Sequence, residues 1–314
     1  MNEKTYEETL PESTAGMRLD QVLATLYPEF SRSRLQGWIK TGRVRLGGVV
    51  PKAKHRLLGG ERLRLEPDAD PEVEWLPEAV DFPVVYEDDD LLVIDKPAGL
   101  VVHPAAGNWR GTLVNGLLHR FPEQAGLPRA GVVHRLDKDT TGLMVVARSR
   151  LAHDDLIAKL RVHAVRRAYY ALVQGVATGG GTVDAPLGRH PVDRKRMAVR
   201  AGGKPAVTHF RVERRYPAHT ALRVELETGR THQIRAHLAH VRYPLVGDPV
   251  YGGRPRPPAG AGDAVREALE TFPRQALHAM RLAFDHPRDG RPVEFESVLP
   301  DDLQRLIGVL NGTV

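Results

Sequence analysis

Residues 132–147, VVHRLDKDTTGLMVVA, set a densely charged loop between two apolar runs. The runs at 132–133 and 143–146 consist of residues that favour buried strands. Between them stand a histidine, an arginine, a lysine, two aspartates and two threonines, and Gly142 closes the loop. A polar loop between buried strands holds its side chains at a sheet edge, where a substrate can reach them. The other interpretation is a charged turn whose ion pairs only satisfy one another.

The segments on either side of this loop read mainly as strands. Residues 84–104 hold apolar runs around an acidic turn, and residues 209–213 and 222–227 alternate with period two, as half-exposed antiparallel strands do. Helical spacing is confined to residues 113–120, 152–162 and 231–240. We therefore predict an α+β domain over residues 81–306, with a mostly antiparallel central sheet and flanking helices. Residues 307–314 are expected to be a C-terminal tail.

Residues 17–66 follow a different pattern, helix-helix-hairpin. Apolar residues recur at helical spacing in MRLDQVLATLYP and again in SRSRLQGWIKTG, where Pro28 and Gly42 end the two helices. RVRLGG and RLRLE then read as two short strands around a basic turn at 52–56. This predicts a small α/β domain. The polar residues 1–16 are expected to be a disordered tail, and residues 67–80, with three prolines and many acids, a linker.

Charge is unevenly distributed along the chain, whose net charge is +6. Residues 17–66 carry eleven Lys or Arg against four acids, whereas residues 67–95 carry eleven acids and no basic residue. Two basic regions on either side of an acidic connector indicate a polyanionic partner, unless the basic residues only solubilise the surface. The small domain resembles the S4 RNA-binding domain, and the alternative is a basic cap without a ligand. Its expected RNA contacts are Arg32, Arg34, Lys40, Arg43, Lys52 and Lys54.

The composition also excludes some classes of site. The chain has no cysteine, which excludes disulfides, thiolate zinc sites and cysteine nucleophiles. No apolar run approaches the roughly 18 residues of a membrane span, and the acidic N-terminus does not resemble a signal or transit peptide. We expect a cytoplasmic monomer without membrane contact.

Five segments, in order, resemble motifs of the RluA family of pseudouridine synthases. They are IDKPAGLVVHPA (94–105), HRLDKDTTGLMVVA (134–147), RRAYYALVQG (166–175), LETGRTHQIRAHLAH (226–240) and ALHAMRLAFDHP (276–287). The resemblance covers about residues 17–306, including the S4-like domain. Within the family, VDAPLGRHP, GKPAVTHF and VGDPVYGGRPRPP are most similar to bacterial enzymes that act on 23S ribosomal RNA.

This resemblance implies an isomerase that converts uridines clustered in a 23S ribosomal RNA stem-loop into pseudouridine. The base is flipped out, its glycosidic bond breaks, and C5 is joined to the sugar, without a cofactor or a metal. The absence of a phosphate-binding glycine loop and of a dinucleotide motif agrees with this. The expected partner is the free 23S RNA or the pre-50S ribosomal particle.

The resemblance also assigns roles to residues. Asp137 starts the reaction, either as a nucleophile or as a base that removes a sugar proton to give a glycal. Tyr169 stacks on the target base and helps to move its C5 proton, and Arg235 pairs with the Asp137 carboxylate. From the residues alone, Tyr169 could instead be a core aromatic, and Arg235 a surface arginine at a helix start.

The remaining assignments concern the loop and its surroundings. Arg135 is expected to fill the place that the flipped base vacates, and Leu282 to close the apolar side of the pocket. Thr140 and Gly142 are expected to shape the loop. The other expected RNA contacts are His134, which also supports the loop, and Arg189, His190 and Lys195.

Two rival functions are open at this point. A non-catalytic RNA-binding or ribosome-assembly protein could use the same fold, although it would need none of Asp137, Tyr169 and Arg235. A metal-dependent nuclease or phosphohydrolase could use Asp137, Asp139 and the histidines of THQIRAHLAH. His237 and His240 share a helical face, but His232 lies five residues before His237 and well off that face, so we expect no metal. Activity in excess chelator would remove this rival.

Overall fold

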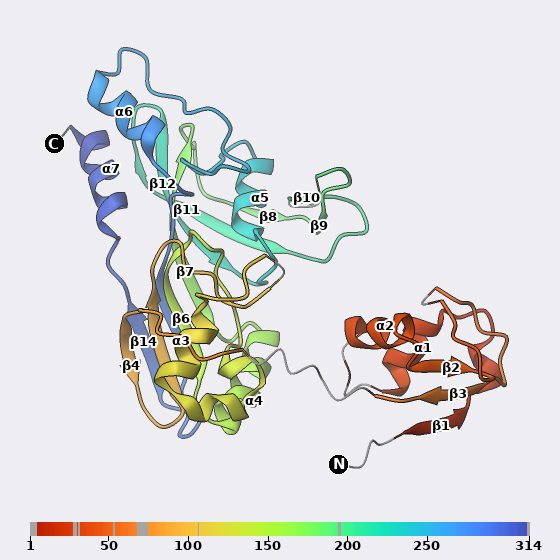
Figure 1. Ribbon diagram of the computed structural model, residues 1–314. Helices are drawn as coiled ribbons and strands as arrows, with labels where there is room; N and C mark the ends of the chain where they lie inside the picture. Colours follow the sequence, from red (N-terminus) through yellow and green to blue (C-terminus); the bar gives the residue numbers. More distant parts are fainter. Residues whose placement is uncertain are drawn as a thin grey trace. The chain divides into compact units, whose positions relative to one another are not determined.

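The computed structural model describes residues 5–27, 30, 32–52, 54–67, 75–105, 107–193 and 196–312, without the side chains of residues 32–34. The chain divides into two compact units, residues 1–74 and 75–314 (Figure 1). Each unit has its own buried apolar cluster, as expected of separate domains.

The N-terminal unit packs two helices on a three-stranded antiparallel sheet. The helices are α1 (Leu19–Leu26) and α2 (Arg32–Lys40), and the strand order is β1 (Tyr6–Thr9), β3 (Arg62–Leu65), β2 (Val44–Leu46). Apolar side chains on one face of each helix meet those of the sheet in a single cluster. The predicted helices and hairpin strands are confirmed.

Strand β1 and the short helix η1 (Glu12–Thr14) lie where a disordered tail was predicted. Tyr6 pairs with Leu65, and its ring lies 5.0 Å from that of Tyr27 and 6.1 Å from that of Phe30. An edge strand needs few apolar residues, because one partly buried aromatic and one row of backbone hydrogen bonds can hold it. For this reason the polar composition of residues 1–16 concealed the strand.

The C-terminal unit is built on one large sheet (Figure 1). Its strand order is β4-β5-β6-β13-β7-β12-β11-β8, and β14 also pairs with β13. Among the described strands of this sheet every pairing is antiparallel except that of β6 with β13, so the predicted sheet is confirmed. The bounds are β4 Val84–Glu87, β5 Leu91–Lys96, β6 Thr141–Ala147, β7 Arg166–Gln174, β8 Gly181–Asp184, β11 Val207–Arg215, β12 His219–Leu226, β13 Leu277–Asp285 and β14 Pro292–Glu296.

Helices flank this sheet. The predicted helices are confirmed as α3 (Leu113–Arg120), α4 (Arg150–Arg161) and α5 (Gln233–His240). Thr112 and Ser149 cap α3 and α4, each with a side-chain oxygen that accepts a backbone N–H three residues on. Two further helices were not predicted, α6 (Asp263–Thr271) and α7 (Asp301–Asn311), and α7 runs into the expected C-terminal tail. The shorter elements are η2 (Pro122–Gly126), η3 (Pro128–Gly131) and the hairpin of β9 (Leu187–Arg189) with β10 (Met197–Val199).

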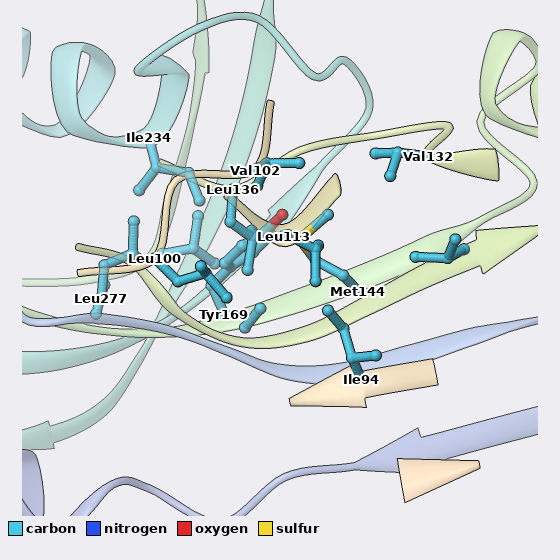
Figure 2. Close-up of a cluster of buried hydrophobic side chains, with 14 of the residues drawn as sticks. Ile94, Leu100, Val102, Leu113, Val132, Leu136, Met144, Tyr169, Ile234 and Leu277 are labelled. Carbon is cyan, nitrogen blue, oxygen red and sulfur yellow. The ribbon is translucent and has the colours of Figure 1, made fainter. Parts of the chain in front are cut away.

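The central strands are buried on both faces. Leu92, Ile94 and Met144 of β5 and β6 contribute to the main core, whereas Leu91 and Val93 pack on the other face, in the cluster that includes α4. Figure 2 shows the main core, which includes Tyr169 and also Leu136 of the loop that leads into β6. The loop therefore rests on a rigid apolar base. In the described part of the chain, no helix combines the length and the apolar character that a membrane crossing requires.

Candidate active site

The loop at residues 134–140 leads into β6 and is fixed at both ends. At its start, the Nε2 atom of His134 accepts a hydrogen bond from the Val145 N–H at 3.0 Å. Near its end, the Thr140 N–H donates to the Asp137 carbonyl at 3.1 Å and closes a turn. The predicted strand before the loop is reduced to one isolated bridge, between Val132 and Val146. The loop is therefore a rigid turn on a sheet, as its position between apolar runs predicted.

Buried side chains from other segments hold the carbonyl groups of this loop. Lys96 is fully buried, and its ammonium donates to the carbonyls of Pro97, Leu100 and Lys138 at 2.7, 3.0 and 2.8 Å. Burial lowers the pKa of Lys96 to about 7, and the charges of Asp139 and Asp137 oppose this. Three acceptors match the three N–H groups of an ammonium, so these contacts favour its charged form.

Residues from just before β13 complete this support. The Nη1 atom of Arg274 donates to the Asp139 carbonyl at 3.2 Å, and its Nε atom pairs with Asp302 at 2.6 Å. The Gln275 amide donates to the Thr140 hydroxyl at 3.0 Å. Each loop carbonyl or hydroxyl held in this way is prevented from moving away from the sheet.

Gly142 closes the loop for a steric reason. Its φ angle is +110°, and a Cβ at this position would lie 2.3 Å from the Ala279 carbonyl oxygen. The parallel contact between β6 and β13 thus brings two backbones too close for any side chain. The predicted shaping role of Gly142 agrees with this geometry.

Asp137 faces an arginine that is held from its other side. The Nη1 atom of Arg235 donates to Asp137 Oδ2 at 2.9 Å, and its Nε and Nη2 atoms donate to Asp248 at 2.7 and 2.9 Å. The side chain of Asp248 is fully buried, and it also accepts hydrogen bonds from the N–H groups of Val250 and Tyr251. Burial would lower the pKa of Arg235, but the Asp248 and Asp137 carboxylates raise it. The predicted pairing of Asp137 with Arg235 is present.

Tyr251 connects this ion pair to the β9–β10 hairpin. Its ring centroid lies 5.2 Å from the guanidinium carbon of Arg235 and 5.3 Å from that of Arg196. Its hydroxyl accepts the Met197 N–H at 2.8 Å and lies 3.1 Å from His232 Nδ1. Burial lowers the pKa of His232, and the Asp137 charge opposes this effect. A neutral His232 leaves Arg235 as the cation nearest to Asp137.

The site opens into a cavity of about 530 Å³, a size suited to a small ligand. Asp137 lines it, and the apolar lining includes Leu136, Tyr169, Ile234 and Leu277 (Figure 2). Tyr169 is 5% exposed, and its hydroxyl makes no hydrogen bond to any described residue. Burial raises the pKa of Tyr169, and the Arg167 charge opposes this. The neighbouring Tyr170 packs in a different cluster, on the opposite face as the strand alternation predicted.

Leu282 does not line this cavity, contrary to the sequence prediction. It lies beyond a bulge between Ala279 and Arg281 and packs with Leu143 and Val145 in the cluster that includes α4. A bulge changes which face the following residues present, and alternation in the sequence cannot reveal it. Leu277 takes the place on the cavity that Leu282 was expected to fill.

The cavity is strongly cationic. The described residues that line it include six arginines but a single carboxylate, that of Asp137; the arginines are Arg129, Arg135, Arg161, Arg167, Arg230 and Arg235. Burial, with the charges of nearby arginines, lowers the pKa of His103 to about 4 and that of His134 to about 3, so both are neutral. The field in the cavity therefore comes from guanidinium groups and favours a polyanion.

The predicted RNA contacts fall into three groups. Arg135 is exposed at the cavity, which Thr140 and His134 also line. Lys40, Lys52 and Lys54 are exposed and Arg43 is half-buried in the N-terminal unit, and Arg189 and His190 lie at the β9–β10 hairpin. Lys195 and the side chains of Arg32 and Arg34 lie outside the described residues. Contact with RNA stays a prediction for all of them.

Of the histidines considered for a metal, His237 has other partners. His237 is buried, with Nδ1 2.9 Å from the Thr208 hydroxyl and Nε2 3.0 Å from the Ala185 carbonyl. Across the residues that the structure describes, no three His, Asp or Glu side chains are arranged to hold a metal ion.

Sequence reasoning missed several residues of this site, and Asp248, Tyr251 and Lys96 are three of them. Asp248 lies in VGDPVYGG, Tyr251 in the same segment, and Lys96 in IDKPAG, all within segments that were noted only for their resemblance. A fully buried lysine and aspartate need partners, but the partners come from distant segments. Only the three-dimensional structure identifies them.

Family models match both units of the chain. A family model described as RNA pseudouridylate synthase matches residues 90–240, and one described as S4 domain matches residues 17–63. Two similar proteins are named ribosomal large subunit pseudouridine synthase D. The one from Pseudomonas aeruginosa is 55% identical to this chain, over 96% of this chain and 94% of the relative. The one from Escherichia coli strain K12 is 50% identical, over 97% of this chain and 94% of the relative.

Solved structures give the same fold. The human RNA pseudouridylate synthase domain containing 1 is 25% identical, with a TM-score of 0.56 over 74% of this chain and 89% of that one. The human RNA pseudouridylate synthase domain containing 4 is 24% identical, with a TM-score of 0.57 over 73% of this chain and 93% of that one. With high identity over nearly all of both chains, this chain belongs to the RNA pseudouridylate synthase family, the isomerases that convert uridine in RNA into pseudouridine.

Proposed function

We propose that this isomerase acts on uridines of 23S ribosomal RNA in the cytoplasm, as a monomer, on the free RNA or on the precursor of the large subunit. The names of its relatives support a large-subunit substrate, and the S4 domain supports RNA binding. The observation that carries the proposal is the Asp137 carboxylate, which faces a cationic cavity with one oxygen bound to Arg235.

A uridine must leave its stack to reach Asp137. Flipping a nucleotide costs a few kcal/mol, which contacts in the cavity must repay. Arg135 is exposed beside the cavity, in a position to stack on the bases that the uridine leaves. The apolar lining around Tyr169 and Leu136 suits the faces of the flipped uracil.

The chemistry starts from the second oxygen of Asp137. Arg235 binds Oδ2, while Oδ1 has His232 Nε2 at 3.9 Å, beyond hydrogen-bond distance. In one route Oδ1 attacks C1′ and expels uracil, whose C5 then displaces the carboxylate and loses its proton as N1 gains one. In the other, the carboxylate removes the C2′ proton as the C1′–N1 bond breaks, which gives a glycal and a uracil anion. C5 of this anion then bonds to C1′ while Asp137 returns the proton to C2′, and C5 loses its own proton as N1 gains one. Both routes return Asp137 to its starting state.

Tyr169 supports either route through its ring. The ring lies at the base of the cavity, where uracil can stack on it before and after it rotates. Because the pKa of Tyr169 is raised, its hydroxyl is protonated when RNA arrives and acts as a donor. It can accept the C5 proton only if its own proton passes on.

The test is tritium release from ribosomal RNA labelled at uridine C5, in excess chelator. Release by the wild type and by Asp139→Asn, with none by Asp137→Asn, would establish the substrate and place the chemistry on Asp137. Equal release by Asp137→Asn would overturn the assignment. Tight binding of this RNA without release by the wild type would contradict the proposed substrate. Loss of release in chelator would favour a metal-dependent reaction.

A further inference from the structure

Arg167 is a buried cation without a partner among the described residues. It lies on β7, two residues before Tyr169, is 9% exposed and lines the cavity. No hydrogen bond or ion pair joins its side chain to another residue in the described part of the chain, and its Nε atom is buried and unsatisfied. A buried, unpaired charge costs considerable free energy. Such a group in a binding cavity is expected to receive its partner from a ligand.

The structure keeps space for this guanidinium. A Cβ at Gly229 would lie 3.1 Å from Arg167 Nη1, tighter than an ordinary contact. Gly229 follows β12 and lines the same cavity between Thr228 and Arg230. The glycine thus leaves room for the guanidinium at the cavity wall.

The expected ligand is an anion, because the described residues supply none to Arg167. The one carboxylate among the described cavity residues, Asp137, already binds Arg235. Uracil and ribose are neutral, so the anionic group of an RNA nucleotide is its phosphodiester. A guanidinium can bind two phosphate oxygens at once.

The direction of the strand supports the same ligand. Arg167 and Tyr169 point to one face of β7, about 7 Å apart along the strand. Within a nucleotide the base and the phosphates are attached to different carbons of the sugar. A base stacked on Tyr169, with its sugar at Asp137, therefore directs a neighbouring phosphate away from the base.

We propose that Arg167 binds the phosphodiester next to the flipped uridine and thereby sets the position of its C1′ against Asp137. The inference rests on the proposed function, because it takes RNA as the substrate. Arg167 is then a positioning residue. No described residue compensates its charge in the free protein, and the phosphate neutralises it in the complex.

The experiment scans the phosphates of a uridine-containing stem-loop of large-subunit ribosomal RNA. Each oligonucleotide carries one uncharged methylphosphonate, and fluorescence anisotropy measures its affinity for the wild type, Arg167→Met and Arg167→Lys. Arg166→Met is the matched control, since Arg166 is the exposed neighbour on the opposite face. Thermal unfolding without RNA is measured for every variant.

One methylphosphonate next to the flipped uridine should weaken wild-type binding by about 10- to 100-fold. Arg167→Met should bind unmodified RNA more weakly than the wild type does, by the same factor. Introducing that methylphosphonate should then weaken the binding of Arg167→Met no further. Arg167→Lys should recover part of the affinity, and Arg166→Met should behave as the wild type. Without RNA, Arg167→Met should unfold no lower than the wild type, whereas removal of a structural arginine would lower the unfolding temperature.

Two results would overturn the inference. In the first, Arg167→Met retains the full methylphosphonate effect at every phosphate, or the wild type shows none. In the second, Arg167→Met unfolds at a lower temperature and loses affinity equally for all the oligonucleotides, as a folding defect would. Binding is measured without turnover, so a wild type that makes no pseudouridine in this RNA would refute the proposed substrate separately.

Discussion

Asp248 binds the Arg235 guanidinium through both carboxylate oxygens, at 2.7 and 2.9 Å, whereas Asp137 binds it through one, at 2.9 Å. The arginine is therefore positioned from its buried side, and the carboxylate at the cavity keeps an oxygen for chemistry. The hydrogen bonds from Arg235 also hold the pKa of Asp248 below its usual value, in spite of burial.

Asp248→Asn should both destabilise the protein and slow its reaction. The change leaves Arg235 without its main buried counter-ion, and breaking a buried pair costs about 3–5 kcal/mol. Urea unfolding at pH 7 measures the stability, and tritium release measures the activity. Asp263→Asn, at the exposed start of α6, is the control and should change neither. An Asp248→Asn protein of wild-type stability would contradict the role given to this pair.

Tyr169→Phe should separate the ring of this residue from its hydroxyl. The hydroxyl has no described partner, so we expect a stability change within about 0.5 kcal/mol, but a large reduction in turnover. Tyr169→Ala should cost about 3–5 kcal/mol, because it leaves a hole in the main core. Urea unfolding and tritium release test both variants. Full turnover by Tyr169→Phe would show that the hydroxyl has no part in proton movement.

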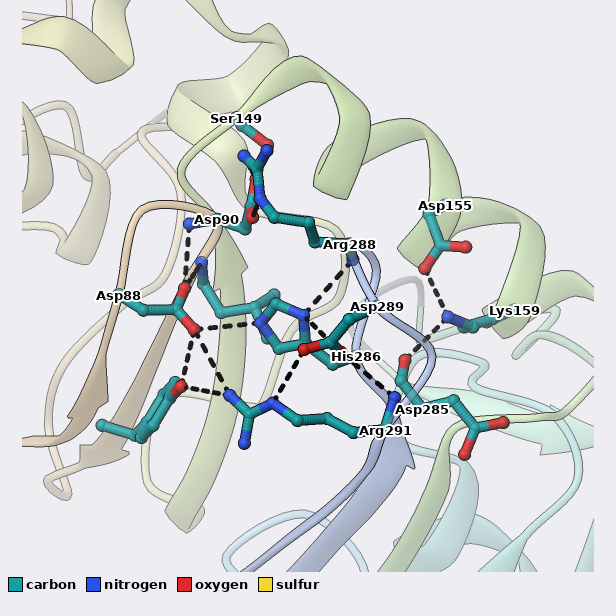
Figure 3. A network of polar contacts seen from close by, with 12 residues as sticks. Asp88, Asp90, Ser149, Asp155, Lys159, Asp285, His286, Arg288, Asp289 and Arg291 are labelled. Atoms are coloured by element: carbon teal, nitrogen blue, oxygen red, sulfur yellow. Dashed lines mark hydrogen bonds and ion pairs between the residues drawn. The ribbon is translucent and has the colours of Figure 1, made fainter.

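A polar cluster away from the cavity makes a prediction about acid stability. Figure 3 shows this cluster with Asp88 and His286. The Asp88 carboxylate binds the Tyr86 hydroxyl, the His286 ring and the N–H groups of Asp90 and Leu91. Burial opposes ionisation of Asp88, but these hydrogen bonds outweigh it and lower its pKa from 3.8 to about 2. The cluster joins the β4–β5 turn to the segment between β13 and β14.

Asp88 should thus stabilise the fold by about 2 kcal/mol above pH 4. Its pKa is lower in the folded state, so this contribution is complete above 3.8 and is lost as the pH falls towards 2. Asp88→Asn should lower the stability at pH 7 and flatten its dependence on pH in that window. Urea unfolding at pH 7, 4 and 2.5 tests this, with the exposed Asp89→Asn as control. Equal acid sensitivity in both variants would refute the assignment.

The exposed lysines of the N-terminal unit allow a test of its RNA role. Replacing Lys52 and Lys54 together by alanine should weaken RNA binding. The slope of log affinity against log salt concentration should also become less steep, by about 1 for each phosphate that these lysines neutralise. Turnover at saturating RNA should stay the same, since the active-site residues lie in the other unit. The exposed Arg266→Ala on α6 removes a charge elsewhere and serves as the control. An unchanged slope for the lysine pair would contradict RNA binding there.

Much of this fold could be predicted from local patterns. The alternating strands, three of the flanking helices and the sharp turn at Gly142 depend on residues that are close in sequence. The pairing of Asp137 with Arg235 was also expected, though only because the two motifs resemble a known family. Spacing alone would not bring together residues 98 positions apart.

What could not be predicted depends on distant contacts. Leu282 was misplaced because a bulge changes the face that it presents. Strand β1 was missed because Tyr6, which is partly buried, is the one aromatic that packs it against the domain core. Asp248 and Lys96 carry charges whose partners are identified only when the strands are in place. A charged residue in the sequence does not reveal whether it will be exposed or buried.

Arg274 and Gln275 bind the loop at Asp139 and Thr140 across 135 residues of sequence, which sets an order of events during synthesis. The chain emerges from the ribosome with its N-terminus first, and domains generally fold as units as they emerge. The RNA-binding unit can therefore fold before the loop that carries Asp137 has its supports. A nascent chain could hold RNA well before it could modify it, and catalytic competence would arrive only with the last strands.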